Sequence, residues 1–451
     1  MNRISVIILA AGKGQRMKSH LPKVLHCLAG RPLLHHVLST ASEIDVEKQI
    51  VVLGPEMEEV ANTTLINWPN LQFALQSERL GTGHALKVAE QSNGGFSGDI
   101  LVLYGDVPLL SARTLENLIS SYRNQKADIA ILSFRPKNPK GYGRIVSKTG
   151  NTVLKVVEQE EATQKEQEIK ICNSGIFIGN AKVLSQQLTQ LNANNSKGEY
   201  FVTDIFSHAA KAGHKCIHLE VEDNSEVLGI NDQIQLAEAE AVIQSRLRLT
   251  ALESGVSMVD PSTVWLCWDT KLAKDVTIEP NVVFGSQVSV EAGAQIRAFC
   301  HLEGVNIGKG AVIGPFARLR PDTVIGKDAK IGNFVEIKKS IIGDQTKVNH
   351  LSYIGDTNIG NSSNIGAGTI TCNYDGYQKS QTKIGNDVLI GSNSSLIAPI
   401  EISDRAVVGA GSVLTENVSA DSIVVSRAKQ VENSGAATRR RQREKKKPDD
   451  S

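Results

Sequence analysis

The C-terminal half of the chain carries a hydrophobic pattern that repeats every six residues between Val276 and Val413. This spacing fits neither an α-helix, with its period of about 3.6, nor a plain strand, with its period of about two. A short strand followed by a tight turn fits it, because the glycine that often follows the aliphatic residue readily adopts positive φ. Ordinary strands of a sandwich do not explain so many repeats in phase. The pattern therefore predicts a parallel β-helix with a shared aliphatic core. The clearest run is Ile307, Ile313, Leu319, Ile325, Ile331 and Ile337.

The N-terminal half shows a different pattern, in which short apolar runs alternate with helical periodicity. The first apolar run, Arg3 to Ala11, ends in a glycine-rich loop. Alternating strands and helices with short links predict a doubly wound, mostly parallel α/β sheet of the Rossmann type. The further strand-like runs are Gln49–Leu53, Leu71–Gln76, Ile100–Tyr104 and Ile129–Phe134, and the helical patterns are Pro32–Ile44, Thr82–Gln91 and Thr114–Asn124.

A long helical pattern, Asp232 to Glu253, joins the two halves, and Gly255 follows it as a stop signal. We therefore expect an α/β domain over residues 1–231, a linker helix over residues 232–255 and a β-helix over residues 256–425. The remaining segment, residues 426–451, contains a basic run from Thr438 to Lys447. Such a run predicts a solvated, disordered tail.

Composition argues against several classes of protein, namely nucleic-acid-binding, zinc- or disulfide-stabilised and membrane-spanning proteins. The 451 residues are 41% hydrophobic and 22% charged, with a net charge of +1, so no bulk charge directs the chain to nucleic acid. Six scattered cysteines without a CxxC pair predict neither a zinc nor a disulfide framework. No apolar stretch is long enough to span a membrane, and we expect no signal peptide, since the sequence leads directly into a strand-like run. We expect a cytoplasmic protein without membrane insertion or a nucleic-acid partner.

The glycine-rich loop from Gly12 to Arg16 is the first candidate binding element. It is not a P-loop, and Met17 stands where the dinucleotide fingerprint has its third glycine. The alternative is a tight turn between strand and helix. However, two glycines allow backbone N–H groups to approach phosphate oxygens, and Arg16 and Lys23 add positive charge nearby. The combination predicts a triphosphate site.

Asp106 follows the strand Ile100–Tyr104, which is a usual position for a carboxylate that holds Mg²⁺ against a nucleotide. A cap for the following helix is an equally good explanation. Gln76 and the pair Gly81–Thr82 follow the preceding strand, where a strand end and a helix cap are the alternatives.

These segments resemble the nucleoside-diphosphate-sugar pyrophosphorylases. The resemblance implies that an oxygen of a sugar 1-phosphate attacks the α-phosphorus of a nucleoside triphosphate. Arg16 and Lys23 then act as catalytic residues by stabilising charge on the departing pyrophosphate. The motifs that carry the resemblance are LAAGKGQRM at residues 9–17, LPKVL at 21–25, GTGHA at 81–85 and YGDVP at 104–108.

The resemblance also implies which residues hold the metal and the nucleotide sugar. Asp106 and Asn231 bind Mg²⁺. The residues assigned to the acetamido sugar are Gly143, Glu158 and Asn173, and those assigned to the uracil are Gln76, Gly81 and Thr82. The other residues assigned to UTP or the nucleotide sugar are Leu9, Ala10, Ala11, Gly12, Lys23, Tyr104 and Gly105.

The β-helix departs from its repeat at four places, and loops on a rigid scaffold often carry function. These places are Arg318–Arg320, Glu336–Lys339, Lys347–Tyr353 and the loop Thr371–Lys383. A lone histidine such as His350 is usually structural. Here Arg320 and Lys338 recur on neighbouring coils and would attract an anionic substrate. An imidazole titrates near physiological pH, so His350 can accept a proton from an attacking amine.

Long motifs in the β-helix extend the resemblance over nearly the whole chain. GPFARLRP, GNFVEIKK, NHLSYIGD and NIGAGTITCNYDG are similar to those of the bacterial bifunctional UDP-N-acetylglucosamine pyrophosphorylase/glucosamine-1-phosphate acetyltransferases. The resemblance implies a left-handed β-helix, homotrimers and acetyl-transfer sites between subunits. It also implies that His350 is the general base when the amine of glucosamine 1-phosphate attacks acetyl-CoA, before uridylyl transfer from UTP.

The same resemblance assigns further residues to acetyl transfer. Ala367 would act through its backbone, at the developing oxyanion. The acceptor-binding residues are Arg320, Lys338, Tyr353 and Asn364, and the acetyl-CoA-binding residues are Ala367, Asn373, Tyr374, Ser392, Ala410 and Arg427. A pyrophosphorylase with a purely structural β-helix is the main alternative, and a non-enzymatic scaffold is the second.

Overall fold

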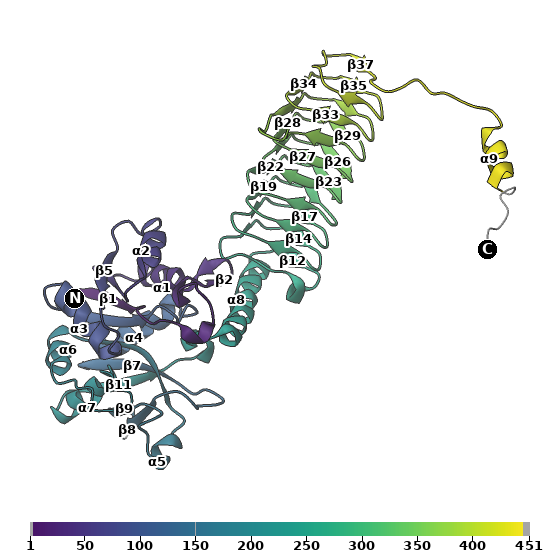
Figure 1. Ribbon diagram of the computed structural model, residues 1–451. Coiled ribbons are helices and arrows are strands. Elements are labelled where there is room, and N and C mark those ends of the chain that lie inside the picture. The colour runs from purple at the N-terminus through teal and green to yellow at the C-terminus, as the bar shows by residue number, and fades with distance from the viewer. Residues whose placement is uncertain (1–2, 149, 445–451) are drawn as a thin grey trace. The chain divides into compact units, whose positions relative to one another are not determined.

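The computed structural model describes residues 3–148 and 150–444 (Figure 1). The chain forms two compact units, one up to Leu247 and the other from Arg248 onward. Each unit has its own buried core, and the long helix α8 (Gln233–Glu253) contains the point where they divide.

The first unit is built on one large sheet with the strand order β11-β7-β10-β6-β1-β4-β5. β1 lies between β4 and β6 and is parallel to both, which confirms the predicted α/β sheet. The strands β10 and β11 were not foreseen, and β10 departs from the parallel arrangement because it runs antiparallel between β6 and β7. The strands are β1 (Ile4–Leu9), β4 (Lys48–Leu53), β5 (Gln72–Leu75), β6 (Asp99–Tyr104), β7 (Ile129–Phe134), β10 (Cys172–Asn180) and β11 (Cys216–Glu220).

Both faces of this sheet are buried, which explains the continuous apolar run of β1. Val6 and Ile8 belong to one core, and Ile7 and Leu9 belong to the core on the opposite face. Helices cover both faces (Figure 1). They are α1 (Leu33–Ser42), α2 (Glu58–Leu65), α3 (Thr82–Ser92), α4 (Ala112–Asn124), α6 (Ala181–Leu188) and α7 (Asp204–Lys211), whereas the short helix α5 (Gln164–Gln167) buries no residue.

Short elements complete the first unit at the end of the sheet where its parallel strands finish. A hairpin of β8 and β9 leaves the main sheet and pairs with β10 through Arg144 and Cys172. Further short segments carry the residues between β1 and α1 and those before α8. They are η1 (Gln15–Met17), η2 (Lys23–Leu25), β2 (Cys27–Leu28), β3 (Arg31–Pro32), β8 (Arg144–Ser147), β9 (Val153–Val157) and η3 (Asn224–Val227).

The second unit is a parallel β-helix, as the six-residue period predicts. Ile313 pairs with Ile331, and Ile331 pairs with Val348, so each aliphatic residue stacks on its equivalent one coil further along. All three side chains are almost fully buried. The strands form three parallel sheets, and the arrangement is consistent with the left-handed winding that the resemblance implies.

We call the three sheets the first, second and third face, in the order in which each coil visits them. The first face runs from β12 (Ser257–Met258) to β37 (Ile423–Val424), the second from β15 (Val283–Phe284) to β36 (Val413–Leu414), and the third from β13 (Lys271–Leu272) to β34 (Ile400–Ile402). The first corner is the turn from the first to the second face, and the second corner is the turn from the second to the third. Figure 1 shows the coils stacked along one axis.

The strands that bear site residues all belong to the first two faces. Those of the first face are β20 (Val312–Ile313), β23 (Lys330–Asn333), β26 (Lys347–His350), β29 (Asn364–Ile365), β32 (Leu389–Ile390) and β35 (Val407–Val408). Those of the second face are β18 (His301–Leu302), β21 (Arg318–Leu319), β24 (Glu336–Lys338), β27 (Tyr353–Gly355), β30 (Ile370–Cys372) and β33 (Ser395–Ile397).

The third corner, where each coil returns to the first face, is fixed by a ladder of side-chain hydrogen bonds. The N–H of Lys327 donates to Asp344 Oδ1 at 2.8 Å, and the N–H of Asp344 donates to Asn361 Oδ1 at 2.8 Å. The N–H of Asn361 donates in turn to Asn386 at 2.8 Å, and that of Asn386 to Asp404 at 2.7 Å. These bonds satisfy turn N–H groups that lack a strand partner.

The C-terminal segment differs from its prediction. Ala436–Glu444 forms helix α9, whereas the basic run predicted a disordered tail. Alanine, arginine and glutamine are good helix formers, which explains the difference. The last residues of the predicted tail, Lys445 to Lys447, lie outside the described residues. Among the described residues, no helix has both the length and the apolar character needed to cross a membrane.

Two buried histidines make the first unit sensitive to acid. The Nε2 atom of His36 donates to the carbonyl of Leu28 at 2.8 Å, and the Nε2 atom of His35 lies 3.2 Å from the hydroxyl of Thr64. Burial lowers the pKa of both from 6.5 to about 4. Between pH 4 and pH 6.5 the unfolded chain therefore binds more protons than the folded chain. The contribution of the neutral histidines to the free energy of unfolding should be fully present above pH 6.5 and should fall as the pH drops towards 4.

The reporter for this prediction is Trp68, whose ring lies 5.0 Å from that of His35. Urea unfolding would be followed by its fluorescence in a chain with Trp265 and Trp268 changed to Phe. The His36→Gln variant keeps a donor for Leu28 but does not titrate, so its unfolding free energy should depend less steeply on pH. An identical slope in both chains would contradict the assignment to His36.

Candidate active sites

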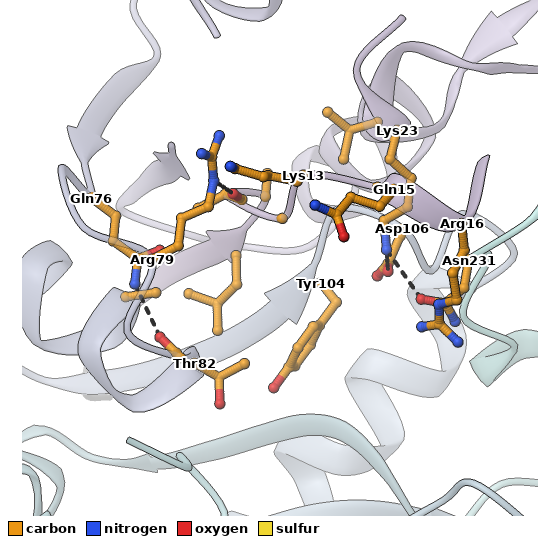
Figure 2. Close-up of a pocket in the computed structure, with 18 of the residues that line it drawn as sticks. Lys13, Gln15, Arg16, Lys23, Gln76, Arg79, Thr82, Tyr104, Asp106 and Asn231 are labelled. Atoms are coloured by element: carbon orange, nitrogen blue, oxygen red, sulfur yellow. Dashed lines mark hydrogen bonds and ion pairs between the residues drawn. The ribbon is translucent and has the colours of Figure 1, made fainter. Parts of the chain in front are cut away.

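A pocket of about 570 Å³ opens at the carboxyl ends of β1 and β6. It brings together residues that the sequence places far apart. In Figure 2, Gln76, Arg79 and Thr82 lie at one end, Asp106 and Asn231 lie at the other, and Tyr104 stands between them. The predicted residues that line the pocket are Leu9, Ala10, Ala11, Gly12, Arg16, Lys23, Gln76, Gly81, Thr82, Tyr104, Asp106 and Asn231.

The glycine-rich loop reaches this pocket because Gly14 has no side chain. Gly14 has a φ of 64°, and a Cβ atom there would lie 2.6 Å from Cβ of Lys23. The loop therefore packs directly on η2, and the short helices η1 and η2 set Arg16 and Lys23 at the pocket. The loop is thus a tight turn, as the alternative explanation for the glycines predicted. It also brings the positive side chains of Arg16 and Lys23 to one cavity.

Lys23 occupies the centre of the polar end of the pocket. Its Nζ atom forms an ion pair with Asp106 Oδ2 and donates to Asn231 Oδ1 at 3.3 Å. Lys23 and Asp106 are both largely buried, so the two oxygens already face one cation. In the described part of the chain, no group of three or more His, Cys, Asp or Glu residues is placed so that it could hold a metal ion. One carboxylate and one amide oxygen fit a divalent cation that takes its other ligands from phosphates and water.

The alternative explanation for Asp106 is not supported. Helix α4 is capped by Ser111, whose hydroxyl accepts from the N–H of Thr114 at 3.2 Å. Asp106 therefore remains available to the pocket. Gly81 does stand at the cap position of α3, but without a side chain. Thr82 is not a cap either, because its hydroxyl accepts from the N–H of Val202 at 3.1 Å.

The three residues assigned to the sugar form a second group beside Tyr104. Asn173 donates its N–H to the carbonyl of Gly143 at 2.9 Å, and the open side of Gly143 faces Glu158 and Asn173. They do not line the nucleotide pocket itself, and neither does Gly105, which is buried under Ala10. A Cβ atom at Gly175, two residues after Asn173, would lie 2.7 Å from the Tyr104 ring. Tyr104 therefore separates the two groups.

Burial shapes the electrostatics here. It raises the pKa of the Glu158 carboxyl, although a hydrogen bond of 2.9 Å from the Thr203 hydroxyl lowers it in part. The pKa of Tyr104 is raised by burial and, to a smaller extent, by the carboxylates of Glu158 and Asp106. Tyr104 is therefore a neutral hydrogen-bonding group at physiological pH.

Sequence reasoning missed Arg79. Its Nε atom donates to the carbonyl of Ala11 at 2.7 Å, and its Nη2 atom donates to the carbonyl of Pro55 at 2.9 Å. It thereby links the ends of β1 and β4 and is a fourth positive side chain at the pocket, besides Lys13, Arg16 and Lys23. A lone arginine after a strand gives no periodic signal, so the sequence offered no way to find it.

In the second unit, His350 ends β26 and its side chain is exposed rather than in the core. Its Nδ1 atom lies 2.7 Å from Oδ1 of Asn333, the residue directly below it in the neighbouring strand. An amide oxygen can only accept, so in the neutral ring Nδ1 carries the proton and Nε2 keeps its lone pair. The lone pair on Nε2 is what a general base requires.

Four residues assigned to acetyl-CoA form a column above His350 at the first corner. The N–H of Gly368 donates to the His350 carbonyl at 3.3 Å, and the N–H of Asn393 donates to the Ala367 carbonyl at 2.7 Å. The next bonds in the column are Gly411 N–H to the carbonyl of Ser392 at 2.8 Å and the Arg427 guanidinium to the carbonyl of Ala410. Ala367, Ser392, Ala410 and Arg427 therefore follow His350 one coil at a time.

Most of the acceptor residues lie elsewhere, at the second corner. The Arg320 guanidinium donates to Glu336 at 2.9 Å, and Lys338 is paired with Gly355 on the next coil. The open side of Gly355 faces the Tyr353 hydroxyl and the Asn373 amide. Asn373 is held by Asp356, and Asn364 stands apart on the first face. Tyr374 is exposed on the loop that follows Asn373.

Lys379 joins this group and was not predicted. Its pKa is lowered because the Lys338 ammonium lies beside it. Two ammonium groups that face one another form a natural site for an anion. The loop Thr371–Lys383 was noted as an interruption of the repeat, but sequence alone could not show that it folds back towards Lys338.

Comparison with known proteins finds matches for both units. A model of the MobA-like NTP transferase domain matches residues 6–169, and a model of the GMPPB C-terminal domain matches residues 302–439. The bifunctional protein GlmU of Paramagnetospirillum magneticum is 46% identical over 440 residues, which cover 97% of this chain and 96% of that protein. The chain belongs to the bifunctional GlmU family.

Two further GlmU proteins agree. That of Sphingopyxis alaskensis is 45% identical over 97% of this chain and 96% of its own length. That of Azorhizobium caulinodans is 46% identical over 96% of each. The family match therefore includes both units and is not confined to the nucleotide pocket.

The contact between Asn333 and His350 generates a prediction that needs no substrate. Changing Asn333 to Leu keeps a similar shape but removes the acceptor, so the proton of the neutral ring should move from Nδ1 towards Nε2. The ¹⁵N shifts of His350, assigned by comparison with His350→Ala, would report the tautomer. Asn333→Asp is the matched control because it keeps an acceptor. An unchanged tautomer in Asn333→Leu would contradict the orienting role.

Proposed function

We propose that this protein is a cytoplasmic bifunctional enzyme of UDP-N-acetylglucosamine synthesis. It transfers an acetyl group from acetyl-CoA to glucosamine 1-phosphate, and then transfers a uridylyl group from UTP to the product. The observation that carries the proposal is the gathering of polar residues into two sites in separate units. Membership of the bifunctional GlmU family supports it.

Uridylyl transfer takes place in the pocket of the first unit. A phosphate oxygen of N-acetylglucosamine 1-phosphate attacks the α-phosphorus of UTP, the bond to the β-phosphate breaks, and pyrophosphate leaves. The chain supplies position and positive charge rather than a nucleophile. Arg16 and Lys23 neutralise the departing pyrophosphate, and Gln76, Gly81 and Thr82 hold the uracil. Asp106 and Asn231 would hold a divalent cation, which we propose is Mg²⁺ and which would supply further charge neutralisation.

The sugar binds on the far side of Tyr104. Gly143, Glu158 and Asn173 contact the acetamido group, because they converge on one small surface beside that ring. The missing side chain of Gly143 leaves room for the sugar, and Glu158 and Asn173 offer hydrogen-bond partners for its hydroxyl and amide groups.

Acetyl transfer takes place on the β-helix. Nε2 of His350 accepts a proton from the amine of glucosamine 1-phosphate, the amine nitrogen attacks the thioester carbonyl, and the carbon–sulfur bond breaks to release the CoA thiol. The backbone at Ala367 stabilises the oxyanion. Ser392, Ala410 and Arg427 hold CoA along the column, and Asn373 and Tyr374 complete its contacts. Arg320, Lys338, Tyr353, Asn364 and Lys379 bind the acceptor.

We propose that the acetyl-transfer site forms between subunits of a homotrimer. The acceptor cations lie at the second corner, whereas His350 lies at the first, and the second face separates them. The strand of the second face that lies between them, β27, is three residues long, and at about 3.3 Å per residue it spans roughly 10 Å. The amine and phosphate of glucosamine 1-phosphate are on neighbouring ring carbons and cannot bridge that distance. A second copy would bring its acceptor corner to this histidine.

A ladder of aromatic rings supports association at the first corner. Phe299, Phe316 and Phe334 stack with ring centroids 4.8 and 5.2 Å apart, and Leu351 continues the ladder next to His350. All four side chains are about half exposed. A contiguous apolar ladder of this kind on a surface is typical of an interaction site.

The assay that tests the whole proposal separates the two reactions. Purified protein would be incubated with glucosamine 1-phosphate, acetyl-CoA, UTP and Mg²⁺, and thiol and pyrophosphate release would be followed separately. His350→Ala should lower thiol release by about 10²- to 10⁴-fold, because it removes the general base. The same variant should still release pyrophosphate when supplied with N-acetylglucosamine 1-phosphate. Asp106→Ala should release thiol like the wild type but should lose most of the pyrophosphate release.

The two alternatives give different results in the same assay. A pyrophosphorylase with a structural β-helix would release pyrophosphate but no thiol, and His350→Ala would leave all activity intact. A non-enzymatic scaffold would release neither product.

The subunit arrangement generates its own prediction. Phe316→Glu places a charge in the middle of the aromatic ladder, so the trimer should dissociate into monomers on light-scattering chromatography. Acetyl transfer should be lost, while uridylyl transfer should continue. Val324→Glu changes a similarly exposed residue on the third face and is the matched control. A monomeric wild type with full acetyl transfer would rule out a site between subunits.

A further inference from the structure

The two oxygen ligands of the proposed cation come from segments far apart in the sequence. Asp106 opens one segment, residues 106–111, which links β6 to α4. Asn231 closes the other, residues 223–231, which contains η3 and leads into α8. The N–H of Ile230 donates to the carbonyl of Asp106 at 2.9 Å, so the backbones of the two segments touch beside the ligands. Away from this hydrogen bond, the distance between the two segments is set by side chains that connect them.

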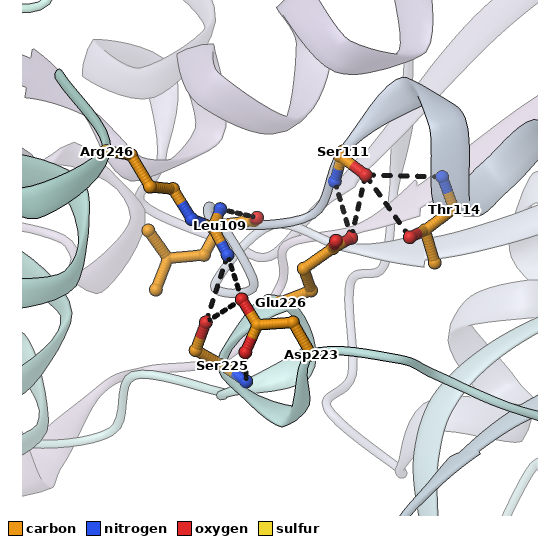
Figure 3. Close-up of polar contacts among 7 residues, drawn as sticks. All are labelled: Leu109, Ser111, Thr114, Asp223, Ser225, Glu226 and Arg246. Atoms are coloured by element: carbon orange, nitrogen blue, oxygen red, sulfur yellow. Dashed lines mark hydrogen bonds and ion pairs between the residues drawn. The ribbon is translucent and has the colours of Figure 1, made fainter. Parts of the chain in front are cut away.

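Glu226 makes one such connection (Figure 3). Its Oε2 atom accepts from the N–H of Ser111 at 3.0 Å and from the hydroxyl of Ser111 at 2.9 Å. Ser111 is also the cap of α4. A single carboxylate oxygen of the Asn231 segment therefore anchors the point where the Asp106 segment becomes helical.

Arg246, on α8, makes the second connection. Its Nη1 atom donates to the carbonyl of Leu109 at 2.6 Å, and its Nη2 atom donates to Asp223 at 2.9 Å and to the hydroxyl of Ser225 at 3.0 Å. One planar guanidinium thus contacts both segments at once, and its rigid fork fixes their spacing. Figure 3 shows Arg246 reaching Leu109 with one nitrogen and the Asp223–Ser225 turn with the other.

The helix that bears Arg246 is itself tied to the rest of the pocket. Near its start, Gln235 accepts from the N–H of Asn231 at 2.8 Å, and Gln233 donates to the carbonyl of Met17, next to Arg16, at 3.3 Å. Further along, Glu240 accepts from the N–H of Ala29 at 2.8 Å. α8 therefore contacts segments that follow the glycine-rich loop, Lys23 and Asp106.

We propose that Arg246 and Glu226 are positioning residues for uridylyl transfer, and that they set the distance between the oxygens of Asp106 and Asn231. The inference rests on the proposed function of the pocket. Neither residue touches the nucleotide site, and both act through the segments they hold. Supporting residues of this kind matter because small displacements of metal-binding groups weaken binding strongly.

The test uses the full chain and the variants Arg246→Met, Glu226→Leu and Glu226→Gln. Glu226→Gln is the conservative variant because a carbonyl oxygen can still accept from Ser111. Arg3→Met is the matched control. Its guanidinium pairs with Glu47 at 2.9 Å on the surface, before β1, whereas the pocket opens after that strand. Binding of Mn²⁺ to the protein alone would be measured from the loss of the free Mn²⁺ electron paramagnetic resonance signal.

We expect Arg246→Met and Glu226→Leu to raise the Mn²⁺ dissociation constant by about tenfold, in line with the loss of groups that support metal ligands. The Mg²⁺ concentration for half-maximal uridylyl transfer should rise by a similar factor, and kcat at saturating Mg²⁺ should largely recover. Glu226→Gln and Arg3→Met should stay near wild type. Acetyl transfer should be unchanged in every variant, which shows that the second unit is intact.

The positioning role is overturned if folded Arg246→Met and Glu226→Leu bind Mn²⁺ like Arg3→Met, or if Glu226→Gln is as defective as Glu226→Leu. Should Arg246→Met not fold, the two Glu226 variants decide the question by themselves. A wild-type chain that transfers no uridylyl group would instead overturn the proposed function of the pocket, which is a separate result.

Discussion

The in-register stacking of coils is the constraint on which the second unit depends. Each aliphatic residue pairs with its equivalent in the next coil, as Ile313 does with Ile331, so any departure from the repeat appears at a defined height and corner. The aliphatic residues of the repeat are all needed to fill the core. Side chains can therefore differ without loss of packing only at the corners. The regular spacing of the coils therefore fixes where each corner residue lies, and the column from His350 to Arg427 results directly from this spacing.

The first unit solves the problem of positioning differently. Its pocket residues come from loops that have no common repeat, so each loop needs its own anchor. Gly14 allows close packing on Lys23, and Arg79 links the ends of two strands. The precision that the β-helix obtains from periodicity must here come from individual hydrogen bonds. Loss of one such bond is therefore expected to affect one group of ligands, rather than the whole site.

Much of this could be predicted from the sequence, and the reasons for success and failure are physical. The period of six and the alternation of strands with helices could be read because every core position requires an apolar residue, and these residues are visible in the sequence. The motifs around Gly12, Asp106 and His350 were visible because several unusual residues stand close together. By contrast, the antiparallel direction of β10 leaves no such mark, since a strand buried on both faces looks the same in either direction.

Contacts across long sequence separations were also hidden. Arg79 and Lys379 are single cations in polar loops, and only the fold shows that they face the two sites. The motif resemblance assigned one set of residues to the acceptor and another to acetyl-CoA. It could not show that most of the first set lies at the second corner and that four residues of the second set lie at the first corner, because the six-residue repeat looks the same at all three corners.

The partner of His350 illustrates why geometry adds to motif recognition. Many catalytic histidines are oriented by a carboxylate, which stabilises the protonated ring and makes it a stronger base. Asn333 instead supplies a neutral amide oxygen, so it fixes the tautomer without adding negative charge. For the acetyl transfer proposed above, the ring must present a nitrogen with a free lone pair to the amine. The amide therefore orients the neutral ring in the tautomer that this proposed role requires.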